Sequence, residues 1–123
     1  MEYHSHIYFT DSTRAIAERL REQLLERFPG RRVSRLVGHP IGPHLYPMFE
    51  IDYDESEKSE VRSFIETHRD GLSVLIHPDV MPEVEAHTTL AVWLGEKLPL
   101  DLTKLDIGTN VNQDIVFKQR PKP

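Results

Sequence analysis

The first regular pattern of the chain is an alternation over residues 3–9, with His6 and Tyr8 on one side and Ile7 and Phe9 on the other. A period of two is typical of a strand that buries one face. Because the apolar pair has to face the core, the histidine and the tyrosine are expected on the opposite face. The chain therefore begins with a predicted strand whose second face carries polar aromatic side chains.

Further along, the apolar residues change to a helical spacing. After Asp11 or Ser12, which can cap a helix, apolar residues recur every four positions until Pro29 stops the pattern. A second segment, residues 56–68, shows similar spacing. The predicted elements are a strand at 3–9, a helix ending at Phe28, strands at 32–37 and 45–53, a helix at 56–68, a strand at 72–77, an ordered segment at 87–95 and a possible last strand at 114–118.

This order predicts an α+β fold, a ferredoxin-like βαββαβ sandwich with an antiparallel sheet, both helices on one face and a C-terminal extension. In it we expect strands 3–9 and 45–53 to lie parallel and adjacent, with strand 72–77 antiparallel on the other side of strand 3–9. A doubly wound parallel sheet is disfavoured, because the link between the second and third strands carries turn residues and no helical pattern. With no repeat or linker, residues 1–123 are expected to form a single domain.

The amino-acid composition limits which metal ligands and which partners the chain can have. The chain has no cysteine, so His, Asp and Glu are its only strong metal ligands. It carries 20 acidic against 15 basic residues, which disfavours nucleic acid as a partner. No apolar run approaches the roughly 20 residues of a membrane span, and no export signal is visible at the start. A cytoplasmic protein without membrane or nucleic-acid partners is expected.

Seven histidines are present, and their positions matter more than their number. By the same alternation, the histidines on strands 3–9, 45–53 and 72–77 all fall on the face opposite the helices. The residues expected on that face are His4, His6, Tyr8, His44, Tyr46, Met48, Glu50, Leu75 and His77.

The positions of these histidines along their strands also place them close together. His4, His6 and His44 begin their strands and His77 ends its strand, so the four are expected at one edge of this face. Strands lie about 4.8 Å apart, which brings side chains of three neighbours within reach of one ion. Glu50 is six residues from His44, about 20 Å along a strand, and is not expected to share that ion.

We therefore predict that His6, His44 and His77 bind one divalent metal, since three imidazoles with an open position suit zinc or ferrous iron. His39, in a turn, and His68, at a helix end, are expected to play no part in the site.

His87 starts a segment that the pattern does not place. Trp93 is more often a core residue than a substrate platform.

Several strings together resemble the small DOPA 4,5-dioxygenase family of fungi and bacteria over nearly the whole chain. They are Tyr3-His4-Ser5-His6-Ile7-Tyr8-Phe9, Gly42-Pro43-His44 with Met48-Phe49-Glu50-Ile51, Ser73-Val74-Leu75-Ile76-His77-Pro78, and His87-Thr88 with Trp93-Leu94-Gly95. The resemblance implies a ferredoxin-like fold, a dimer, and extradiol cleavage of a catechol such as DOPA by O2 at non-haem Fe(II), with zinc as a possible substitute. The family's histidines fall on His4, His6, His44, His77 and His87.

For such a reaction, His4 or His87 is expected to exchange the phenolic proton, because an imidazole titrates near working pH. Tyr8 and Tyr46 could hydrogen-bond the reactants. A carboxylate often completes an iron site, and Asp79 and Glu85 are candidates without a predicted place.

The alternative is a non-enzymatic dimeric module of the same fold that binds a metal or a small ligand, because fold alone does not define activity. In either case we expect a homodimer, with the face opposite the helices covered by a partner or by the tail of the chain.

Overall fold

A computed structural model of the chain describes residues 1–105. In chain order, its helices and strands are β1 (Glu2–Tyr8), α1 (Arg14–Arg27), β2 (Arg32–Val33), β3 (Met48–Asp54), α2 (Lys58–His68), β4 (Val74–Pro78), α3 (Glu83–Ala86) and β5 (Val92–Leu94). Short 3₁₀ turns lie at Asp11–Thr13, Glu55–Glu57 and Leu102–Lys104. The possible strand at 114–118 lies outside the described residues.

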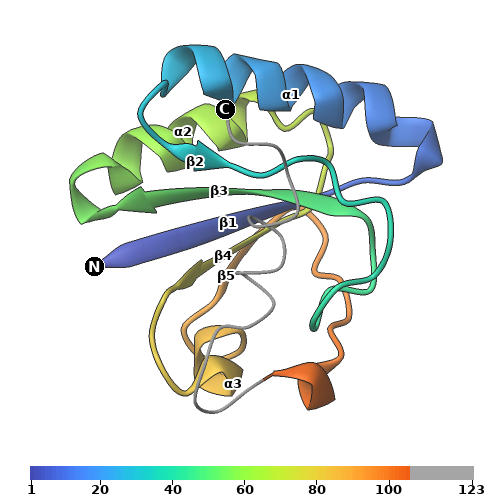
Figure 1. Cartoon of the computed structure of the whole chain (residues 1–123), viewed down its shortest axis with the longest axis vertical. Coiled ribbons are helices and arrows are strands. Elements are labelled where there is room, and N and C mark those ends of the chain that lie inside the picture. Colours follow the sequence, from blue (N-terminus) through green and yellow to red (C-terminus); the bar gives the residue numbers. More distant parts are fainter. Residues whose placement is uncertain (106–123) are drawn as a thin grey trace.

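The strands form one sheet in the order β2-β3-β1-β4-β5, with every neighbouring pair antiparallel. Helices α1 and α2 lie side by side over one face of this sheet, and α3 lies on the other side (Figure 1). The predicted α+β sandwich of βαββαβ order is thus confirmed, and β5 adds a fifth strand at its edge.

The predicted direction of the third strand was wrong. β3 runs antiparallel to β1, with His6 opposite Glu50 and His4 opposite Asp52. The reason is geometric: the crossover through α1 returns the chain in the direction of β1, and the turn between β2 and β3 then reverses it.

The predicted sides of the strands are confirmed. Ile7, Phe49, Ile51, Val74 and Ile76 pack with α1 and α2 residues into one buried cluster. From α1 this cluster takes Ala17, Leu20 and Leu24, with Phe28 at the helix end, as the four-residue spacing indicates. The rigid core therefore holds β1, β3 and β4 in a fixed register.

The second and third strands are shorter than predicted. β2 has two residues, and β3 begins at Met48, so the predicted strand residues His44 and Leu45 lie in the preceding loop. Prolines at 40, 43 and 47 lack the backbone donor that a strand ladder needs, so the chain forms only isolated bridges here, such as Val37 with Met48.

We call the sheet face opposite α1 and α2 the histidine face. Its apolar part is a second buried cluster of Tyr8, Val37, Met48 and Leu75, against which half-buried side chains from later segments pack. These covering side chains are Ile41, Tyr46, Ala91, Trp93, Leu98 and Leu100. Part of the expected cover is therefore supplied by the chain itself. No helix within residues 1–105 is long and apolar enough to cross a membrane.

Candidate metal centre

Five of the seven histidines converge on the histidine face. His4 and His6 come from β1, His77 from β4, His44 from the loop before β3, and His87 from the residue that ends α3. Each is at most 5% exposed. The ring centroids of His6 and His44 lie 4.1 Å apart, and those of His77 and His87 lie 4.0 Å apart.

Strand geometry places three of these rings. His4 and His6 are two residues apart on β1 and so share a side, and His77 of β4 is directly opposite His4. His44 reaches the cluster differently, because its loop folds back over the sheet and pairs with Ile41 and Leu100. The other two histidines lie elsewhere: His39 is exposed in the loop, and His68 stacks on Phe64 at the end of α2.

His87 is the member that sequence analysis did not place. It follows the short helix α3, and its Nδ1 lies 2.7 Å from the backbone oxygen of Glu83. The His87-Thr88 string of the family resemblance was the only signal for it, since no strand or helix period runs through this segment.

Backbone carbonyls determine the tautomer of two rings. Nδ1 of His77 donates to the oxygen of Pro78 at 2.9 Å, and Nδ1 of His87 donates to the oxygen of Glu83. A carbonyl can only accept, so the proton of each neutral ring lies on Nδ1 and Nε2 carries the lone pair. Nδ1 of His44 lies 2.8 Å from the hydroxyl oxygen of Tyr8, which can accept its proton in the same way.

Four of the five rings are held neutral. Burial lowers the pKa of His6 and of His77 well below 6.5, and neighbouring histidines lower both further. The pKa of His44 falls to about 3, mainly through burial, and that of His87 is also lowered by burial. Metal binding requires neutral imidazoles, so these lowered pKa values keep the rings in the protonation state that binds a metal.

The donor atoms fit a divalent metal. His4, His6 and His77 offer nitrogens within 4.8 Å of one another, and so do His6, His44 and His87. Nε2 of His6 lies 2.9 Å from Nε2 of His77, a hydrogen-bonding distance, whereas two nitrogens bound tetrahedrally at about 2.05 Å would be about 3.35 Å apart. His6 belongs to both groups. The predicted ligands His6, His44 and His77 do not form one of these groups, because His77 is in the first and His44 is in the second.

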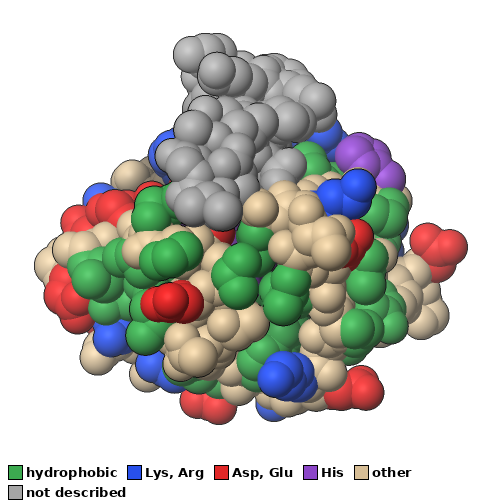
Figure 2. Space-filling view, turned by 90° about the horizontal axis from the view of Figure 1, so that it is seen from below, with side chains coloured by type: hydrophobic (Ala, Val, Ile, Leu, Met, Phe, Trp, Pro, Cys, Tyr) green, Lys and Arg blue, Asp and Glu red, His purple; other side chains and the backbone are tan. Residues whose placement is uncertain are grey.

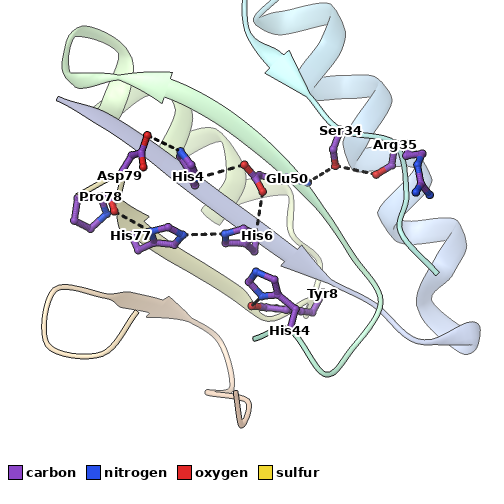
Figure 3. A network of polar contacts seen from close by, with 10 residues as sticks. All are labelled: His4, His6, Tyr8, Ser34, Arg35, His44, Glu50, His77, Pro78 and Asp79. Atoms are coloured by element: carbon purple, nitrogen blue, oxygen red, sulfur yellow. Dashed lines mark hydrogen bonds and ion pairs between the residues drawn. The ribbon is translucent and has the colours of Figure 1, made fainter. Parts of the chain in front are cut away.

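The expectation that Glu50 lies far from this site was wrong. Its carboxylate is 1% exposed and lies 3.4 Å from Nδ1 of His4 and 3.4 Å from Nδ1 of His6 (Figure 3). The antiparallel register of β1 and β3 places Glu50 directly opposite His6. A third potential group, His4 with Glu50 and Asp52, follows from the same pairing.

The other two candidate carboxylates differ. Oδ2 of Asp79 lies 3.6 Å from Nε2 of His4, and the Asp79 side chain is 46% exposed. Glu85 is exposed on α3.

Tyr8 borders the histidine cluster, and Tyr46 packs against the apolar cluster that contains Tyr8. Tyr8 is buried between His44 and the ring of Trp93, on which it stacks at 5.9 Å. Burial raises the pKa of Tyr8 well above 10, with Glu50 raising it further, so the hydroxyl keeps its proton. Tyr46 is half-buried and, with Tyr8 and Leu98, lines a pocket of about 220 Å³.

Without metal, the protein is expected to lose stability as the pH falls from 7 to 5. The pKa of His44 is about 3 when folded against 6.5 as the reference value, so between these values the unfolded chain binds a proton that the folded chain does not. Such a histidine costs about 1.4 kcal/mol per pH unit below its unfolded pKa. Urea midpoints at both pH values measure this, and His44→Gln is expected to reduce the dependence. Equal wild-type midpoints would contradict it.

Fold and site together define a small α+β sandwich protein with a buried histidine cluster suited to a divalent metal. The chain matches the Dopa 4,5-dioxygenase family over residues 3–104, and it belongs to that family.

Relatives support this assignment. A DOPA 4,5-dioxygenase of Amanita muscaria is 33% identical over 117 residues, which cover 89% of this chain and 51% of that protein. An uncharacterised 21.2 kDa protein of Botryotinia fuckeliana is 34% identical over 109 residues, covering 80% of this chain and 60% of that protein. The chain thus spans half to three fifths of the length of these relatives.

A solved structure is also similar. A candidate dioxygenase from Nostoc punctiforme superposes with a TM-score of 0.79 at 32% identity, covering 83% of this chain and 88% of that one.

Proposed function

We propose that this protein is an extradiol dioxygenase that opens the ring of a catechol such as DOPA with O2 at a histidine-bound Fe(II). The observation that carries this proposal is the buried cluster of five imidazoles in a chain of the Dopa 4,5-dioxygenase family. Other divalent metals suit the same donors, and zinc is the expected substitute.

His6, His44 and His77 would hold the metal, and the remaining positions would be left to the substrate. Bound ferrous iron would act as a Lewis acid and as a template for the catechol and O2. The chain's own contribution is to present neutral nitrogens from three separate segments in a site closed to bulk water.

His4 and His87 would handle the phenolic proton. Both are buried beside the proposed ligands, with ring centroids 5.1 Å and 4.0 Å from His77. His4 also faces Asp79 at the surface, which gives its Nε2 a neighbour in contact with solvent. An imidazole in this position can accept a proton from the catechol and return it to the product.

Tyr8 and Tyr46 would orient the reactants. Because Tyr8 keeps its hydroxyl proton and touches His44, it supports both a ligand and the wall of the site. Tyr46 is the more accessible of the two and would contact a ring substituent that enters the pocket it lines with Tyr8.

Anaerobic loading with ferrous iron, followed by DOPA and air, tests the proposal. A yellow ring-opened product and uptake of about one O2 per catechol are expected, since both oxygen atoms enter the product of a dioxygenase. Zinc-loaded protein and tyrosine, which lacks the second hydroxyl, are the matched controls. If iron binds but no catechol consumes O2, the protein is the non-enzymatic binding module instead.

A homodimer is expected in solution. Figure 2 shows hydrophobic side chains at the surface on the side of α3. The exposed large hydrophobic residues include Met81, Val84, Leu90 and Leu102. Exposed apolar area of this kind favours association, and a two-fold pair is the commonest form. Light scattering over a dilution series measures it; the mass of one chain at every concentration would overturn the expectation.

A further inference from the structure

Glu50 is the most deeply buried acidic residue at the histidine cluster among the described residues, since it is 1% exposed against 7% for Asp52. One oxygen faces Nδ1 of His6 and the other faces Nδ1 of His4, each at 3.4 Å. These separations are somewhat longer than a normal N–H···O hydrogen bond. The carboxylate thus spans two imidazoles that alternate along β1 (Figure 3).

The backbone holds Glu50 firmly in this place. Its N–H donates to Oγ of Ser34 at 2.8 Å, and its carbonyl oxygen accepts from the N–H of Ser34 at 2.8 Å. Oγ of Ser34 in turn donates to the oxygen of Arg35 at 2.8 Å. Ser34 is itself fully buried, so the position of the carboxylate is set by the sheet and by this serine.

The contact between His6 and His77 indicates which nitrogen of His6 has to carry the proton when a metal is bound. Nε2 of His77 carries a lone pair, because its Nδ1 donates to Pro78. Nε2 of His6 lies 2.9 Å from that nitrogen and donates its proton to the lone pair in this structure. When a cation lies between these two nitrogens, neither can carry a proton, so the proton of a neutral His6 has to be on Nδ1. The atom that Nδ1 faces is a carboxylate oxygen of Glu50.

We propose that Glu50 is a positioning residue that accepts the Nδ1 proton of His6 and thereby turns the Nε2 lone pair of His6 toward the metal. This inference rests on the metal site of the proposed function. His77 and His87 have backbone carbonyls for the same purpose, and His44 has Tyr8. His6 lies in the middle of β1, where backbone carbonyls are used by the ladder, so a side chain has to supply its acceptor. A carboxylate gives the strongest such bond.

Glu50 acts through His6 and not as a ligand. Its Oε1 faces Nδ1 of His6, whereas the His6 nitrogen beside His77 is Nε2. Its effect on the metal is therefore indirect.

Zinc affinity, measured by competition with a chromophoric chelator, tests this assignment. Glu50→Leu, which removes both acceptor oxygens, is expected to weaken zinc binding about 10- to 100-fold, the usual cost of losing such a partner. Glu50→Gln keeps one acceptor oxygen and is expected to lose less. Ser34→Ala keeps the carboxylate but loosens it, so a smaller loss is expected, and this variant also serves if Glu50→Leu fails to fold.

The comparison variant is Asp54→Asn, which removes a carboxylate from the same strand, four residues away. A change of less than about threefold is expected, because Asp54 is opposite Glu2 and its side chain pairs with Arg31 and not with a histidine. An equal loss in Asp54→Asn would mean that general negative charge is responsible and would overturn the proposal.

Two spectroscopic readouts separate positioning from a merely structural role. In zinc-loaded protein, long-range ¹H–¹⁵N correlation is expected to place the His6 proton on Nδ1; a proton on Nε2 would contradict the proposal. The cobalt(II)-loaded Glu50→Gln protein is expected to keep the wild-type absorption envelope, whereas loss of a direct ligand would change it. None of these measurements uses a catechol, so they can succeed even if the proposed ring cleavage fails.

Discussion

His6→Ala is expected to abolish metal binding and ring cleavage together. His6 belongs to both all-histidine groups and faces His77 Nε2 at 2.9 Å, so its loss leaves neither group intact. Metal content per folded chain is expected to fall to a tenth of the wild-type value or less, on the order of a 10-fold loss. Turnover is expected to fall at least about 10³-fold, since a metal contributes several kcal/mol to the barrier. Metal analysis after anaerobic loading, with circular dichroism to confirm folding, measures both.

Alanine variants of the other histidines test which of them bind the metal. His44→Ala and His77→Ala are expected to lose most of the metal as well, whereas His39→Ala and His68→Ala are expected to retain it, because these two rings lie outside the cluster. Full metal content in all three cluster variants would rule out the proposed ligand set.

His4→Gln and His87→Gln are expected to separate catalysis from metal binding. If these residues exchange the phenolic proton, at least one of the two variants is expected to lower turnover about 10²- to 10⁴-fold while keeping its iron, the usual scale for a general acid or base. Glutamine preserves a polar group of similar length in a buried place. Single-turnover oxygen uptake by iron-loaded protein provides the rate, and metal analysis of the same sample provides the occupancy.

Two outcomes would argue against this division of roles. A loss of iron in His4→Gln or His87→Gln would make that residue a ligand, since each completes one of the all-histidine groups. An equal loss of turnover in His39→Gln would contradict the placement of His39 on the outer loop, where its Nδ1 bonds the oxygen of Pro40.

The arrangement of the cluster explains why one carboxylate has so large a role. Burial and mutual proximity keep the rings neutral, and a neutral ring binds metal only through the nitrogen that lacks the proton. The site therefore depends on acceptors for the other nitrogens. Backbone carbonyls serve at His77 and His87, where the chain leaves β4 or ends α3, but His6 in mid-strand has only a side chain to rely on.

Local patterns were enough to predict which side chains share a face. The alternation of Ile7 with His6 in β1 and of Ile76 with His77 in β4 requires only that one side of each strand be apolar. This is a property of consecutive residues, and it placed His4, His6 and His77 together correctly. The helical spacing of Leu20 and Leu24 likewise sufficed for α1.

Contacts between strands and loops needed the tertiary structure. Whether Glu50 touches His6 depends on the direction and register of β3 against β1, and a parallel pairing would have carried Glu50 far from the cluster. His44 lies in a loop interrupted by prolines, and its approach depends on the bridge to Leu100, which is 56 residues along the chain.

By itself, therefore, the sequence determined the sandwich fold, the family resemblance and the face that holds the histidines, because each follows from short-range periodicity or from continuous strings of residues. The tertiary structure alone decided that the ring of His87 packs against His77 and that the carboxylate of Glu50 lies beside His6. Those contacts arise when segments far apart in the chain are brought together by the common core, and no pattern along the sequence records the register in which they meet.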